Sequence, residues 1–187
     1  INTEKSSSMG RLFDAVSALL GIREYNSYEG ECAIALENAA ARAIEKNAAP
    51  PELYFPIREE EEILLADRKE IIRKIFRETR AAKTWYKEEE RAEALALSFH
   101  EAVSCMVLEM CRRIRERFHE DKVALSGGVF ANVILQERCR SLLEEQGFRV
   151  YVNEQVPGND GGIALGQAWL AAERLMDEKD RGGQICV

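Results

Sequence analysis

Two glycine-rich segments near the end of the chain carry residue types suited to binding a small charged ligand. The first runs from Ser126 to Asn132 with the sequence SGGVFAN, and the second runs from Asn159 to Gly162 with the sequence NDGG. Glycine has no Cβ, so a ligand can approach its backbone closely, and the N–H groups that open a following helix favour a phosphate. Asp160 adds a carboxylate oxygen, which hard metal cations prefer as a ligand. These segments are candidates for one phosphate and metal site.

Each segment also has a plainer interpretation. Gly127 and Gly128 could form a tight strand-to-helix turn that binds nothing, and Asn132 would then be a surface polar residue near a helix start. Asp160 could act as a helix N-cap, since aspartate is among the best N-capping residues. The residues alone leave these alternatives open. Two such turns within about 35 residues of each other favour one shared site.

Two further positions earlier in the chain are weaker candidates. Asp14 lies roughly 160° from the centre of the apolar face of its predicted helix, given about 100° of turn per residue. It therefore points either to solvent or into a cleft. Glu29 and Gly30 form a predicted loop before the next helix, where turn geometry alone would explain the glycine.

The histidines and cysteines do not form a recognisable reactive centre. His100 and His119 have no second histidine three or four residues away, so we expect a packed core-edge residue and a helix-end cation. The cysteines are odd in number and lack a C-x-x-C pair, which predicts reduced thiols rather than disulfides or a zinc finger. They are Cys32, Cys105, Cys111, Cys139 and Cys186.

Hydrophobic spacing predicts the elements that must position these residues. Apolar residues at helical spacing predict helices over residues 11–20, 31–45, 88–119, 129–146 and 163–176, and a further helix capped by Asp67. Short apolar runs predict strands at 122–126 and 148–152 and, less clearly, at 52–57. The glutamates Glu59 to Glu62 are most simply a solvated surface.

The order of these elements predicts a helix-rich α/β fold. We expect residues 1–187 to be a single partial domain, mainly helical over 1–120 and β-α-β-α over 121–187. Such alternation predicts parallel strands whose ligands bind beyond the carboxyl ends, where both glycine-rich turns fall. Two strands make a poor sheet, so further strands must lie upstream or outside this chain.

Composition excludes several classes of function. The 187 residues carry a net charge of −7 and a pI near 5.1, without a lysine and arginine stripe, so nucleic acid is not an expected partner. No run of eighteen apolar residues and no basic-then-apolar leader is present, so we expect no membrane span and no secretory signal. We therefore expect a cytoplasmic protein.

Four segments, taken in order, resemble one family closely. They are residues 8–16 (SMGRLFDAV), 28–34 (YEGECAI), 124–132 (ALSGGVFAN) and 156–167 (VPGNDGGIALGQ). Together they are similar to the C-terminal part of HypF, the carbamoyltransferase family of [NiFe]-hydrogenase maturation. The resemblance implies the C-terminal lobe of a TsaD/Kae-type module with the two-lobed actin/Hsp70-like fold of ribonuclease-H-type halves.

The resemblance implies an adenylate site. Gly127, Gly128 and Asn132 would hold the nucleotide of ATP or carbamoyl-adenylate, Asp14 and Gly30 would lie on its ribose side, and Asp160 would ligate a metal. The family's activity would be transfer of carbamoyl from the adenylate to the C-terminal cysteine of HypE. HypE then dehydrates the product to the nitrile that becomes the iron-bound cyanide.

The chain also departs from the family pattern. The family's H-x-x-x-H metal histidines precede the first residue here, so a divalent metal, Zn or Fe, would need histidines outside this chain as well as the missing N-terminal lobe. We therefore expect the isolated chain to be inactive. Two alternatives stay open: a non-catalytic docking or homodimerisation module, and a tRNA threonylcarbamoyl transferase, which the acidic charge disfavours.

Overall fold

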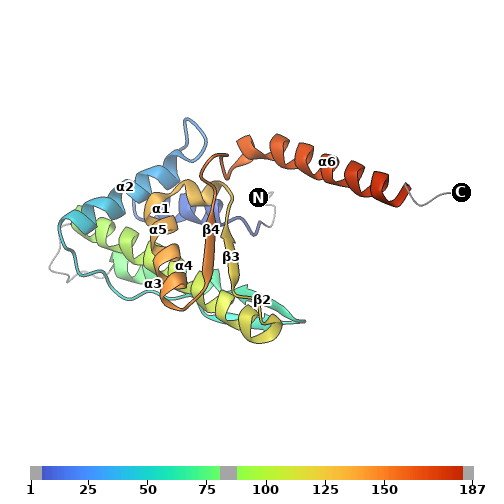
Figure 1. Ribbon diagram of the computed structural model, residues 1–187. Coiled ribbons are helices and arrows are strands. Elements are labelled where there is room, and N and C mark those ends of the chain that lie inside the picture. The colour runs from blue at the N-terminus through green and yellow to red at the C-terminus, as the bar shows by residue number, and fades with distance from the viewer. Residues whose placement is uncertain (1–5, 81–87, 183–187) are drawn as a thin grey trace, which may run out of the picture.

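The computed structural model describes residues 6–80 and 88–182 as a layer of helices beside two small sheets (Figure 1). The helices are α1 (Met9–Leu19), α2 (Glu31–Glu45), α3 (Arg68–Arg80), α4 (Glu88–Phe118), α5 (Val133–Glu145) and α6 (Ile163–Gly182). The strands are β1 (Ile57–Glu60), β2 (Ile63–Ala66), β3 (Lys122–Leu125) and β4 (Arg149–Val152). Two short 3-10 helices, η1 (Gly128–Ala131) and η2 (Asp160–Gly162), lie within the glycine-rich turns. The predicted helix-rich α/β fold is confirmed.

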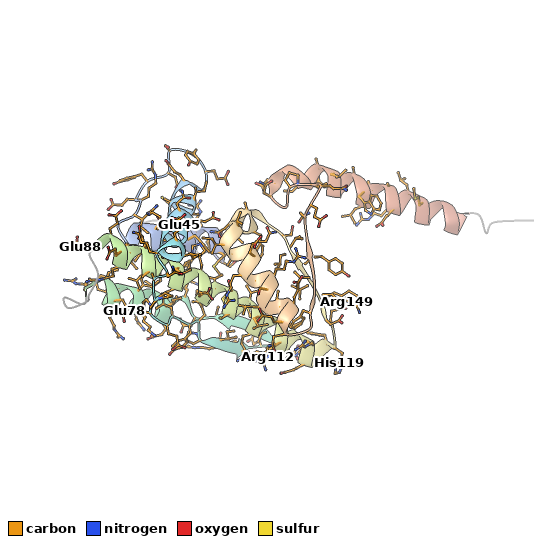
Figure 2. All side chains as sticks on the ribbon, turned by 60° about the vertical axis from the view of Figure 1, so that its left-hand side comes forward. Glu45, Glu78, Glu88, Arg112, His119 and Arg149 are labelled. Carbon is orange, nitrogen blue, oxygen red and sulfur yellow. The ribbon has the colours of Figure 1, made fainter. Side chains whose placement is uncertain are left out.

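Helix α4 is the central helix, as its long apolar stripe predicts. It contacts α2, α3 and α5, and Figure 2 shows Glu88 and His119 at its two ends. Its Phe99 packs edge-on against Phe13 of α1, with ring centroids 4.9 Å apart. Although α4 is long and apolar enough to cross a bilayer, 61% of its most apolar window is buried within the protein. Packing against the other helices therefore buries most of the apolar side chains of α4.

Helix ends follow the capping residues in the sequence. Ser8 accepts a hydrogen bond from the N–H of Arg11 at the start of α1, and the chain turns at Gly21 after its end. The Oδ1 of Asp67 accepts from the N–H of Lys69, which confirms the predicted cap of α3. Helix α2 spans the predicted range of 31–45.

The segment between α2 and α3 differs from the prediction. The predicted strand at 52–57 is wrong, because regular structure begins only at Ile57 and continues into an antiparallel hairpin of β1 and β2. The glutamate run, predicted as plain surface, supplies the turn. Glu61 and Glu62 both have positive φ, at 49° and 68°. Such turns usually carry Asn-Gly, so this sequence holds no hairpin signal.

The last third forms the predicted parallel β-α-β unit. Strands β3 and β4 pair in parallel from Lys122 opposite Arg149 to Leu125 opposite Val152. The predicted helix at 129–146 is wrong at its start, because η1 ends at Asn132 and α5 begins only at Val133. Asn132 has extended φ and ψ and caps α5, which breaks the helical run.

Helix α6 projects away from the other elements (Figure 1). It starts where predicted, at Ile163, and runs past the predicted end to Gly182. Its large apolar side chains are exposed, namely Ile163, Leu165, Trp169, Leu170, Leu175 and Met176. An apolar helix face of this kind is a surface that another protein element can cover.

Candidate active site

A direct hydrogen bond joins the two glycine-rich turns. The backbone N–H of Gly127 donates to the carbonyl oxygen of Gly158 over 2.7 Å. Because β3 and β4 are neighbouring parallel strands, their carboxyl ends lie at the same edge of the sheet, and each leads into one turn. The two turns therefore share one place in the fold, as the sequence predicts.

These turns open onto a cleft of about 970 Å³. Its walls come from five segments: the start of α1, the loop before α2, the first half of α2, η1 with Asn132, and the turn at 159–161. Residues 120 or more positions apart in the sequence thus surround a single space. A cleft of this size is large enough for a nucleotide-sized ligand.

The cleft gathers five of the six residues predicted for the site. Asp14, Gly30, Gly128, Asn132 and Asp160 all line it. The sixth, Gly127, does not line the wall and instead shapes the turn behind it.

Gly127 adopts a backbone conformation that only glycine tolerates well. Its φ is 103° and its ψ is 162°, a region closed to residues that carry a Cβ. This conformation aims the Gly127 N–H at Gly158. The role that the structure shows for Gly127 is therefore to connect the two turns.

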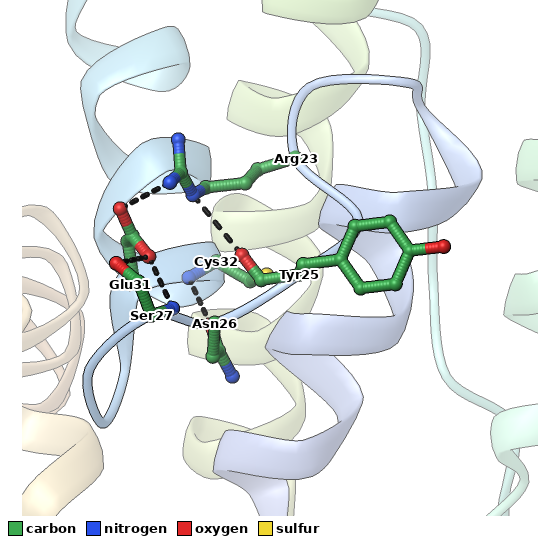
Figure 3. A network of polar contacts seen from close by, with 6 residues as sticks. All are labelled: Arg23, Tyr25, Asn26, Ser27, Glu31 and Cys32. Atoms are coloured by element: carbon green, nitrogen blue, oxygen red, sulfur yellow. Dashed lines mark hydrogen bonds and ion pairs between the residues drawn. The ribbon is translucent and has the colours of Figure 1, made fainter.

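The loop that carries Gly30 is fixed by a polar network at the start of α2 (Figure 3). The carboxylate of Glu31 accepts from the N–H and the hydroxyl of Ser27 over 2.6 and 2.7 Å and pairs with Arg23. The hydrogen bonds from Ser27 lower the pKa of Glu31 below its ordinary value, and Arg23 adds to this. Asn26 in turn accepts from the N–H of Cys32. The network holds the Gly30 turn against the cleft.

Asn132 is buried rather than a surface residue, so the plain interpretation of this position is wrong. Only 8% of its surface is exposed, and its Oδ1 accepts from the N–H of Leu135 over 2.8 Å. Its Nδ2 lies 2.9 Å from Nε2 of His100 on α4. His100 is the packed, hydrogen-bonded residue that the sequence predicts, and it contacts a wall of the cleft through Asn132.

Helix α5 does not offer free N–H groups to a phosphate, contrary to expectation. Glu37 of α2 reaches its first turn, where Oε1 accepts from the N–H of Val133 over 2.7 Å and, more weakly, from that of Ile134. Asn132 occupies the next N–H group. Glu37 is not predicted from the sequence, because its spacing from Gly30 resembles that of any surface residue of α2.

Two open N–H groups lie one turn earlier, in η1. Within residues 6–80 and 88–182, no hydrogen bond is found for the backbone N–H of Gly128 or Val129, and both residues line the cleft. These two groups are therefore backbone donors that an anionic ligand in the cleft can use.

Asp160 is free to act on a ligand. Asn159, not Asp160, caps η2, since its Oδ1 accepts from the N–H of Gly161 over 3.0 Å. The carboxylate of Asp160 has no hydrogen bond or ion pair with another residue of the described part of the chain. The capping role that competed with metal binding for Asp160 thus belongs to its neighbour.

The charge of the cleft is mainly negative. Arg11 is the one lysine or arginine on the wall formed by the described residues, against the acids Asp14, Glu29, Glu37 and Asp160. The Oδ1 of Asp14 is buried and lacks a hydrogen-bond partner among those residues. A buried acceptor without a donor is costly, which favours a ligand hydroxyl at this position.

A metal site is not complete within this part of the chain. The described residues contain no cluster of three or more His, Cys, Asp or Glu side chains that could hold a metal ion. Asp160 alone supplies a single carboxylate, which does not by itself fit a metal ion.

The thiol nearest to the site is not activated. Cys32 of α2 is buried, and this burial, with the nearby charge of Asp14, raises the pKa of its thiol above the ordinary value. A thiol is nucleophilic only as the thiolate. Cys32, Cys105, Cys111 and Cys139 are all unpaired, as predicted, while Cys186 lies outside the described residues.

The fold and the cleft place the chain in the class of Kae1-like carbamoyltransferase domains. The family described as "Carbamoyltransferase, Kae1-like Domain, second subdomain" matches residues 1–167. The chain belongs to this family, and within it to the HypF carbamoyltransferases.

Individual relatives agree with this assignment. The chain is 35% identical over 183 residues to "Carbamoyltransferase HypF" of Rhodobacter capsulatus, covering 94% of this chain and 21% of that protein. It superimposes with a TM-score of 0.77 and 35% identity on "full-length HypF in the phosphate- and nucleotide-bound form", covering 90% of this chain and 21% of that one. The chain thus spans about a fifth of the length of these relatives.

A shorter similarity is found with a threonylcarbamoyltransferase. The chain is 34% identical over 80 residues to "tRNA N6-adenosine threonylcarbamoyltransferase" of Archaeoglobus fulgidus. This match covers 43% of the chain and 25% of that protein. It is shorter than the HypF matches, which extend over most of the chain.

Proposed function

We propose that this chain is the C-terminal catalytic-lobe portion of a HypF-type enzyme and binds the adenylate part of carbamoyl-adenylate in its cleft. The observation that carries the proposal is the Gly127–Gly158 hydrogen bond, which joins both turns at one cleft with Asp14 and Gly30. The relative in the phosphate- and nucleotide-bound form supports a nucleotide as the ligand.

In this proposal each wall of the cleft has a separate task. Asp14, whose buried Oδ1 lacks a donor, accepts from a ribose hydroxyl. The N–H groups of Gly128 and Val129 donate to the phosphate of AMP. Asp160 faces the same ligand from the neighbouring turn and would supply one carboxylate oxygen to a divalent metal whose other ligands, histidines, would lie outside this chain.

The carbamoyl group is transferred to a thiolate of the acceptor protein. The sulfur of the C-terminal cysteine of a HypE-type partner attacks the carbamoyl carbon, the bond from that carbon to the phosphate oxygen breaks, and AMP leaves with the electron pair. The cleft needs no nucleophile of its own, and the raised pKa keeps Cys32 protonated. Backbone donors that hold AMP stabilise the charge on the leaving group.

Replacing Asp160 by alanine in the complete enzyme tests this assignment. We expect D160A to abolish carbamoyl transfer to the acceptor protein, while E154A, which removes an exposed acid outside the cleft, leaves transfer unchanged. Full activity of D160A would show that Asp160 only shapes the turn.

A docking module is the second candidate function, favoured by the exposed apolar face of α6. In this case the chain contributes a surface for its missing N-terminal lobe or for a second copy, and holds no ligand. Calorimetry of this chain with ATP and a divalent metal separates the two functions. Heat of binding supports the adenylate site, whereas no heat together with self-association in sedimentation supports the docking module.

A further inference from the structure

The hydrogen bond to Ala96 defines the tautomer of the neutral His100 ring. Its Nδ1 lies 2.8 Å from the carbonyl oxygen of Ala96, which can only accept, so Nδ1 carries the proton. In the neutral ring Nε2 is then an acceptor, and it lies 2.9 Å from Nδ2 of Asn132. Asn132 must therefore present its NH2 group to His100.

The same orientation of Asn132 satisfies its other neighbour. With NH2 toward His100, Oδ1 faces the N–H of Leu135 and accepts from it over 2.8 Å. A flipped amide would place two acceptors together at His100 and two donors together at Leu135. His100 and α5 therefore select one orientation of the Asn132 side chain from opposite sides.

This orientation leaves a donor for the cleft. The Nδ2 group has two hydrogens, one directed to His100, and the described residues provide no acceptor for the other. Asn132 itself lines the cleft. The group of the Asn132 amide that remains for a cleft ligand is thus an N–H and not the amide oxygen, which accepts from Leu135.

The surroundings keep His100 neutral. Its side chain is 1% exposed, and the rings of Phe13 and Phe99 pack edge-on against it. Burial lowers the pKa of His100 below the ordinary value of 6.5, against the opposing effects of the Ala96 carbonyl and the charge of Glu101. A neutral ring preserves the acceptor at Nε2.

We propose that His100 is a positioning residue for the adenylate site: it lies outside the cleft and fixes Asn132 so that an N–H group faces an acceptor oxygen of the nucleotide. The proposal rests on the proposed function, since it assumes that the cleft binds an adenylate. It assigns a role in ligand binding to a residue of the core helix α4.

Three substitutions of His100 test the proposal in the complete polypeptide that contains this chain. In H100Q the glutamine side chain can accept a hydrogen bond at the position of Nε2. In H100M the methionine side chain has nearly the same shape as glutamine but lacks the amide oxygen, so it cannot accept there. H100N keeps a donor for Ala96 but does not reach Asn132, and it serves if H100M does not fold. AMP affinity is measured by calorimetry and the melting temperature by scanning calorimetry.

We expect H100Q to bind AMP within about threefold of wild type and H100M and H100N to bind roughly tenfold more weakly, as for a lost hydrogen bond. This order should hold even where the melting temperatures of H100Q and H100M agree. The proposal is overturned if H100M or H100N binds AMP as tightly as wild type, or if H100Q binds as weakly as H100M. Failure of the wild-type protein to bind AMP would instead overturn the proposed function.

Discussion

The N–H of Gly127 donates to the carbonyl oxygen of Gly158 over 2.7 Å, which ties two turns 31 positions apart into one wall of a cleft. Because this bond is between backbone groups, it depends on the conformations of the turns rather than on particular side chains. Glycines at sites of close approach are therefore as important to the site as its polar residues.

Gly162 provides a direct test of close backbone approach. A Cβ at Gly162 would clash with the carbonyl oxygen of Pro157, whereas a Cβ at Gly166, one helical turn later, would meet nothing within 4 Å. We expect G162A to lower the free energy of unfolding by roughly 1–3 kcal/mol through overpacking. G166A should instead raise it, by up to about 1 kcal/mol, because alanine favours helix. Urea unfolding of both variants checks this, and equal effects would contradict the structure.

Glu37 should reduce the affinity of the cleft for anions. E37Q keeps an acceptor oxygen for the N–H of Val133 but removes one of the four negative charges on the wall. We expect AMP to bind about two- to fivefold more tightly to E37Q. This change in affinity corresponds to the interaction energy of one charge near a helix N-terminus. Calorimetry measures this, with E45Q at the far end of α2 as the control (Figure 2). Weaker binding would mean that the Glu37 carboxylate contacts the nucleotide itself.

Glu93 connects α4 to α2 through a buried carboxylate. It is 2% exposed and pairs with Arg42 over 2.6 Å and with Lys46 over 2.5 Å. Burial opposes its ionisation, but the hydrogen bonds from Lys46 and Arg42 prevail and lower the pKa of Glu93. We expect E93Q to cost roughly 1–3 kcal/mol of unfolding free energy at pH 7, because hydrogen bonds to a charged group are weakened while Arg42 and Lys46 stay partly exposed to solvent, and E89Q, at an exposed site, less than about 0.5 kcal/mol.

The effect of E93Q should also depend on pH. Since the folded pKa of Glu93 is below its ordinary value of 4.5, its stabilisation is present above that pH and disappears as the pH falls through the folded value. Denaturant unfolding of wild type and E93Q at several pH values measures the difference. A difference that does not shrink in acid would rule out the ion pairs as its cause.

His100 predicts a second dependence on pH, of a different origin. Because its pKa is lowered in the folded protein, the unfolded chain binds a proton more readily below about pH 6.5. Stability should therefore fall as the pH drops from about 6.5, and this component should be missing from H100Q. Unfolding free energies of both proteins between pH 7.5 and pH 5 measure it. Parallel curves would show that the pKa of His100 is the same in the folded and the unfolded protein.

The sequence predicts most of the fold because its signals are local. Asp67 marks the start of α3, and the β-α-β order follows from glycine-rich turns between apolar runs. The β1–β2 hairpin was missed because its turn uses Glu61 and Glu62 at positive φ, where no sequence signal is expected. Asn132 breaks the helix through its cap, which the apolar spacing of 129–146 does not show.

The candidate site was predicted only in part, for a related reason. Gly128, Asn132 and Asp160 stand out in the sequence because they lie in two glycine-rich segments, each between a predicted strand and a predicted helix. Glu37 and His100 contribute through partners 96 and 32 positions away, and no pattern of neighbours reveals such contacts. The sequence therefore predicts residues that line the cleft, but not the residues that hold them in place.

Hydrogen exchange of the complete polypeptide, with and without AMP, tests the central claim that both turns address one ligand. We expect AMP to slow exchange of backbone N–H groups in both residues 126–132 and residues 158–162, with a smaller effect around Gly30. Slower exchange in only one of the two turns, or in neither, would contradict it.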